Sequence, residues 1–194
     1  MRALLAPILA LSLFAAPLQA EPTQLEVSAL AHGAKFIGDR SGGARITITD
    51  AETGEILAEG ITTGGTGNTR LIMAAEQPHW DSIATEGTAS FVTELDIDSP
   101  LQLAITASGP LDAAPEDRVR ASVMSWLLPG DSRTGDRRVI IELPGYLVDV
   151  LNIKQTEGRL EATVDISMLC GCPVIPGGWW DATRIDMQAR LVGA

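Results

Sequence analysis

Two cysteines separated by a single glycine form the most chemically specific part of this chain. Cys170 and Cys172 flank Gly171, follow Met168 and Leu169, and are the only cysteines among the 194 residues. Side chains alternate between the two faces of an extended strand, so Met168, Cys170 and Cys172 are expected to share one face. A thioether and two thiols on one face leave structural, redox and metal-binding roles open.

The first two interpretations of the cysteines are structural burial and a disulfide. Free cysteine is among the most buried residue types, so both thiols could simply extend an apolar strand face. Alternatively, Cys170 and Cys172 form a disulfide, because exported proteins are usually oxidised where thiols can pair. Alternate residues of a strand lie about 6.6 Å apart, near the upper limit for a disulfide, and Gly171 can bend the chain to close that distance.

The third interpretation is a soft-metal site. Met168, Cys170 and Cys172 offer one thioether and two thiolates, a donor set that suits Cu(I). The chain has two histidines, His32 and His79, either of which could reach the site only through the fold. We therefore expect no cofactor, and Cu(I) is the alternative.

A pair of tryptophans follows the cysteines. Trp179 and Trp180 come directly after Pro176, Gly177 and Gly178. They could form an exposed aromatic surface for a sugar ring or a protein partner, or they could cover the open end of a β-sandwich.

The sequence lacks the patterns of common enzyme sites. It has no Gly-x-Ser-x-Gly, and only two histidines are available for any catalytic triad. The glycine-rich segment 64–70 lacks the Lys-Ser/Thr of a phosphate-binding loop. We therefore expect a protein that is not an enzyme and has no catalytic residues.

The first twenty residues have the layout of a secretory signal peptide. Arg2 precedes an uncharged apolar run, and a small residue, Ala20, stands at the expected cleavage position. The run is shorter than the roughly 18–20 residues that span a bilayer. We expect residues 1–20 to be removed, no membrane span in the remainder, and a periplasmic or secreted protein.

The charge balance disfavours two classes of partner. The formal net charge is −11, and loss of residues 1–20, which contain Arg2 and no acid, makes the remaining chain more acidic. Such a surface repels nucleic-acid phosphates and anionic lipid. A protein partner in the cell envelope is the remaining expectation, and the oligomeric state stays open.

Alternation of polar and apolar residues predicts strands throughout the mature chain. A period of two is typical of half-buried antiparallel strands, and turn residues separate the runs. Ser99-Pro100 is expected to form a tight hairpin turn. The predicted fold is an all-β, antiparallel, immunoglobulin-like sandwich. The runs are 45–50, 90–98, 101–105, 119–128, 138–143, 146–153, 159–169 and 183–192.

The segment 110–118 suggests a division of the chain. It is rich in Pro, Ala and acidic residues and has no strand pattern. We expect one sandwich over 21–109, a linker over 110–118, and a second β-rich domain over 119–194 that carries the cysteines. One continuous sandwich with a long crossing loop is the alternative. Whether another chain completes the last predicted strand stays open.

One stretch resembles known β-sandwich modules. Residues 43–63 read Gly-Ala-Arg-Ile-Thr-Ile-Thr-Asp, a short turn containing Gly54, and then Ala-Glu-Gly-Ile-Thr-Thr. This pattern is similar to the central hairpin of transthyretin-like, carboxypeptidase-regulatory-like and immunoglobulin-like bacterial modules. The resemblance implies a hairpin within a module that binds, spaces or stabilises and has no catalytic residues.

These observations together favour a non-enzymatic function. We expect an exported binding or accessory protein of the bacterial envelope. The competing hypothesis is a periplasmic copper-binding protein that uses Met168, Cys170 and Cys172.

Overall fold

A computed structural model describes residues 21–74 and 83–190 of the protein. The predicted signal peptide and His79 lie outside these residues. One short helix, α1 (Thr69–Ile72), and four 3-10 turns occur among the described residues. The remaining regular structure consists of strands: β1 (Glu21–Ala31), β2 (Arg45–Asp50), β3 (Ile56–Ile61), β4 (Phe91–Ile97), β5 (Leu101–Gly109), β6 (Val119–Leu127), β7 (Val139–Leu143), β8 (Tyr146–Thr156) and β9 (Arg159–Met168).

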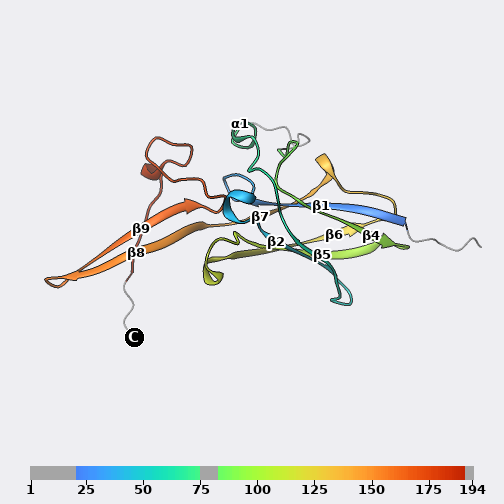
Figure 1. Ribbon diagram of the computed structural model, residues 1–194, viewed down its shortest axis with the longest axis horizontal. Helices are drawn as coiled ribbons and strands as arrows, with labels where there is room; N and C mark the ends of the chain where they lie inside the picture. Colours follow the sequence, from blue (N-terminus) through green and yellow to red (C-terminus); the bar gives the residue numbers. More distant parts are fainter. Residues whose placement is uncertain (1–20, 75–82, 191–194) are drawn as a thin grey trace, which may run out of the picture.

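The strands form three sheets. One sheet has the order β4-β1-β7, the second has the order β3-β2-β5-β6, and the third contains only β8 and β9. The first two sheets stack on each other, and the β8–β9 hairpin extends away from them (Figure 1). The predicted all-β sandwich is therefore confirmed.

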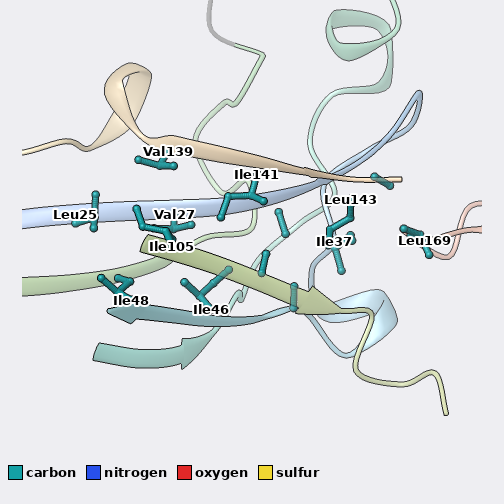
Figure 2. Close-up of a cluster of buried hydrophobic side chains, with 14 of the residues drawn as sticks. Leu25, Val27, Ile37, Ile46, Ile48, Ile105, Val139, Ile141, Leu143 and Leu169 are labelled. Carbon is teal, nitrogen blue, oxygen red and sulfur yellow. The ribbon is translucent and has the colours of Figure 1, made fainter. Parts of the chain in front are cut away.

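Alternating residues of the two stacked sheets build the core. Leu25, Val27 and Ile141 face Ile46 and Ile105 across the space between the sheets (Figure 2). All five side chains are fully buried. The period-two pattern is therefore satisfied by burial of one face of each strand against the other sheet.

Two expected details of strand pairing are wrong. β1 pairs in parallel with β7, so the sandwich is not purely antiparallel. β4 and β5 belong to different sheets, so Ser99-Pro100 carries the chain from one sheet to the other and does not close a hairpin. In β4 and β5 every second residue faces the core, and that pattern does not indicate which strand is the neighbour within the sheet.

The hairpin expected within residues 43–63 is confirmed. β2 and β3 pair antiparallel. The carboxylate of Asp50 accepts hydrogen bonds from the backbone N–H groups of Glu52 and Thr53, at 2.7 and 3.0 Å. Gly54 has a φ of +76°, a left-handed conformation that glycine adopts without steric strain. Local turn chemistry therefore closes this hairpin.

The division expected at 110–118 is wrong for this sandwich. β6 pairs antiparallel with β5, and β7 pairs with β1, so residues 119–143 complete the sandwich that begins at residue 21. The Pro- and Ala-rich segment is a turn between neighbouring strands of one sheet. The structural change along the chain comes instead between Leu143 and Tyr146, where β7 ends and the projecting hairpin begins.

The last predicted strand is also absent among the described residues. Ala182–Arg184 forms a 3-10 turn, and residues 185–190 pair with no strand. Within the described part of the chain, no helix has the length and apolar character needed to cross a bilayer.

Candidate functional site

The Cys-Gly-Cys segment forms a tight turn at the end of β9. The backbone N–H of Gly171 donates to the carbonyl of Met168 at 2.8 Å, and that of Met168 donates to the carbonyl of Cys172 at 2.9 Å. Gly171 has a φ of +71°. The strand therefore does not stay extended through Cys172 as the same-face prediction requires, because the glycine reverses the chain.

This turn is packed into the end of the sandwich. Met168, Leu169, Cys170 and Cys172 are all buried and belong to the same apolar cluster as the core strands. Both cysteines are thiols in the structure. Burial supports the structural interpretation of the cysteines, and the Cys170–Cys172 disulfide stays a prediction.

The two thiols interact with each other and acquire different acidities. The Cys172 thiol donates to the Cys170 carbonyl at 4.0 Å, and the neighbouring Cys172 side chain lowers the pKa of Cys170 to about 6, against the opposing effect of burial. The backbone of Lys35 also lowers the pKa of Cys170. The same thiol contact, with burial, raises the pKa of Cys172. Cys170 is therefore the more acidic thiol of the pair.

We predict that Cys172→Ala raises the pKa of Cys170 towards that of an ordinary thiol, because the substitution removes the Cys172 thiol, which lowers that pKa. Thiolate ultraviolet absorbance during a pH titration in reductant measures this shift. Cys172→Ser, which keeps a hydroxyl donor, is the matched control and should have the lower midpoint of the two variants. Equal midpoints in Cys172→Ala and the parent chain would contradict the thiol contact.

The shifted pKa values of the two cysteines determine whether stability rises or falls with pH. An unfolded cysteine has a pKa near about 8.5, whereas the folded Cys170 has a pKa of about 6. Between these values the unfolded state binds more protons, so stability rises with pH. Above them the raised pKa of Cys172 reverses the trend, because the folded chain keeps a proton that the unfolded chain releases.

The structure gives limited support to a metal site at the cysteines. No group of three or more His, Cys, Asp and Glu side chains is arranged to hold a metal ion among the described residues. His32 lies on the surface, where its Nδ1 is 2.8 Å from Glu142 Oε1. The Cu(I) interpretation therefore rests on Met168, Cys170 and Cys172 alone and stays a prediction.

The two tryptophans have different environments. Trp180 packs against the core, and its indole N–H donates to the carbonyl of Gly33 at 2.8 Å. Trp179 is 60% exposed. Together with Tyr146 and Arg184 they line a shallow recess of about 260 Å³. Trp180 covers one end of the sandwich, and a ligand or partner surface at Trp179 and Trp180 stays a prediction.

The β8–β9 hairpin presents an uncovered apolar face. All of its residues from 148 to 165 are exposed. Three apolar cross-strand pairs share one face: Val148 with Ile166, Val150 with Val164, and Ile153 with Ala162. Polar pairs alternate with them: Asp149 with Asp165, Asn152 with Thr163, and Lys154 with Glu161. The hairpin is amphipathic, but its apolar face lies outside the sandwich core.

A groove runs between this face and the segment that follows the tryptophans. Residues 187–190 line it on one side, and Val150, Ile153 and Val164 are among the hairpin residues that line it on the other. Its volume is about 550 Å³, larger than the recess beside Trp179. In Figure 1 the last coloured segment of the chain crosses the hairpin in this view. The groove is therefore a larger opening than that recess, and apolar side chains make up most of its lining.

Sequence reasoning located both strands of the hairpin but missed that their apolar face is uncovered. The alternation of Leu160, Ala162, Val164 and Ile166 is visible in the sequence. It predicts an apolar face and gives no information about what covers that face. The run Tyr146 to Leu151, with one charge in six residues, was the available signal of an unusually apolar projecting strand.

Sequence reasoning also missed a buried ion pair in the sandwich. Arg138 Nη1 lies 2.9 Å from Glu26 Oε1, and the two side chains are 8% and 11% exposed. The other Glu26 oxygen accepts from the backbone N–H of Gly135 at 2.7 Å. These bonds join β1 to the turn that precedes β7, so the pair has a structural role.

Comparison with known proteins gives no family assignment: no protein-family model, no curated protein and no solved structure matches the chain.

Proposed function

We propose that this chain is an exported, non-enzymatic binding or accessory protein of the bacterial envelope that docks onto a protein partner through β8–β9. The observation that carries this proposal is the apolar face of the projecting hairpin. The signal-peptide pattern of residues 1–20 supports export to the periplasm or exterior. The acidic charge argues against nucleic acid as the partner.

The exposed apolar side chains of the hairpin support a partner large enough to cover several of them at once. Val148, Val150 and Ile153 are 48%, 57% and 59% exposed. Covering side chains of this kind stabilises a complex by about 1 kcal/mol each. A two-stranded hairpin is marginally stable in water on its own, and it gains stability when a further element covers its apolar face. Docking of a partner would therefore stabilise the β8–β9 hairpin and bury its apolar side chains in the same step.

A photo-crosslinking amino acid at position 150 tests this function in producing cells. Position 152 is the matched control, because Asn152 lies on the polar face of the same strand. We expect position 150 to give one discrete cross-linked protein and position 152 to give little or none. Absence of a cross-link from position 150 would contradict the proposal.

Copper binding is the second candidate function, favoured by one observation. Met168, Cys170 and Cys172 are buried together in one tight turn, and the lowered pKa of Cys170 favours the thiolate, which is the form that binds Cu(I). Native mass spectrometry after brief Cu(I) exposure and desalting tests this. Copper retained by the parent chain and lost from the Cys170→Ser/Cys172→Ser variant would favour it. A mass lower by two hydrogens, without copper, would favour the disulfide.

A further inference from the structure

We propose that the partner adds an extended β-strand to an open edge of the β8–β9 hairpin, with apolar residues at alternate positions that continue the apolar face of the groove and basic residues between them on the polar face. This inference rests on the proposed function and names the chemistry of the partner. It is argued from the side chains of the groove, the unpaired backbone around it, and the charge of the chain.

The side chains of the groove have the spacing of a strand surface. Val148 and Val150 lie two residues apart on β8, and Leu160, Ala162 and Val164 lie two residues apart on β9. An extended segment places every second side chain on one face with the same repeat. Alternating apolar side chains of an added strand would therefore continue these rows on the same face.

The backbone beside the groove is available for pairing. β8 and β9 pair only with each other among the described strands, so each has an unpaired edge. Residues 187–190, which line one side of the groove, have no backbone hydrogen bond to the rest of the described chain. A strand can satisfy such N–H and C=O groups by adding to an edge, whereas a helix or a lipid chain cannot.

The segment 185–190 already shows what sits on this surface. Ile185 and Met187 line a smaller recess with Val164 and Ile166, and that recess shares Val164, Ile166 and Met187 with the groove. Ile185, Met187 and Ala189 are apolar and alternate with polar residues. The chain's own alternating segment therefore contacts the near end of the apolar face, and the groove is the part that it leaves uncovered.

The negative charge of the chain favours a basic partner over a second copy of the chain. The net charge is −11, so two copies repel each other. The hairpin itself carries four acidic residues, Asp149, Glu157, Glu161 and Asp165, against the two bases Lys154 and Arg159. Because the apolar positions of the added strand continue the apolar face, the basic residues between them would lie on the polar face, beside Asp149, Glu161 and Asp165 and away from Arg190, which lines the groove.

Three nine-residue peptides test the inference by fluorescence anisotropy with the whole mature chain. The first alternates Val and Lys, the second has the same composition in two blocks, and the third has Pro at the central Val of the alternating sequence. We expect the alternating peptide to bind about tenfold or more tighter than either other peptide, because only it can pair along its length. Equal binding of all three would overturn strand addition and leave simple charge attraction.

Two variants of the chain localise the binding. Val150→Asp places a charge in the groove and is expected to weaken binding of the alternating peptide by about tenfold or more. Asn152→Asp adds the same charge on the polar face and is expected to change it by less than about twofold. Equal effects of the two variants would overturn the inference.

Other occupants are separate outcomes of the same experiments. Sedimentation that shows dimers of the parent chain, lost in Val150→Asp, would assign the groove to a second copy and overturn the inference. So would tighter binding to an amphipathic helical peptide or to anionic vesicles. If position 150 cross-links a protein in cells while the alternating peptide fails to bind, the proposed function stands and strand addition fails.

Discussion

Replacing Glu26 by alanine is expected to lower the free energy of unfolding by about 3–5 kcal/mol, because the substitution leaves the Arg138 guanidinium buried without its carboxylate. Arg138 lies 2.9 Å from Glu26 and is 8% exposed. Its Nε–H still donates to the carbonyl of Gly135 at 2.8 Å, but a carbonyl does not neutralise the charge. The Gly135 N–H also loses its acceptor.

Chemical denaturation of Glu26→Ala beside Glu59→Ala measures this effect. Glu59 pairs with Arg45 at 3.1 Å on the surface, where both side chains are nearly half exposed, so its loss should cost less than about 1 kcal/mol. Replacing Glu26 and Arg138 together by methionine removes both charges and is expected to recover most of the stability. A loss in Glu26→Ala no larger than in Glu59→Ala would contradict this assignment.

Replacing Leu169 by alanine is expected to lower the free energy of unfolding by about 2–5 kcal/mol, because it leaves a cavity at the end of the core. Leu169 is fully buried and lies where the Cys-Gly-Cys turn meets the sandwich (Figure 2). The substitution should also speed alkylation of Cys170 and Cys172, since these neighbours depend on the same packing for their burial.

Leu151→Ala is the matched control for this prediction. Leu151 is 66% exposed on the hairpin, so the same truncation there should change stability by no more than about 0.5 kcal/mol. Thermal unfolding and thiol alkylation rates measure both variants. Equal stability and equal alkylation in the two variants would show that the turn is not anchored by Leu169.

The strands of the sandwich could be predicted because their alternation is local. In β2 and β9, apolar residues at every second position are enough to define a strand, whatever packs on it. β1 was missed because Thr23, Glu26 and Ser28 interrupt its apolar pattern yet are buried. These polar side chains are buried because hydrogen bonds and the Arg138 ion pair satisfy at least Glu26 and Ser28.

The arrangement of the strands could not be predicted, because it depends on contacts between distant residues. Nothing in 110–118 distinguishes a linker from a turn within one sheet, and pairing of β1 with β7 joins residues more than 100 positions apart. Residues 185–190 have a strand pattern but no neighbouring strand with which to pair. An alternating pattern predicts a capacity for pairing, and the fold decides whether a partner is present.

The candidate sites could likewise be predicted only in part: their local features are visible in the sequence, and the features that depend on the fold are not. The closeness of Cys170 and Cys172 could be predicted from one intervening residue, but their different acidities depend on how the turn sets the two side chains against each other, and then on burial and Lys35, all of which come from the fold. The amphipathic character of β9 was visible in the sequence. That its apolar face is uncovered became visible only when the stacked sheets proved complete without it.

Cross-linking from the two faces of the hairpin in intact cells tests the central claim most directly. The photo-reactive residue is placed at 150, at 164 on the partner strand of the same face, and at 152 and 163 on the polar face. The account predicts that positions 150 and 164 capture the same protein, that 152 and 163 capture much less of it, and that Ile153→Asp abolishes capture from 150. Equal capture from both faces, or none from either, would contradict the claim that this hairpin is the docking surface.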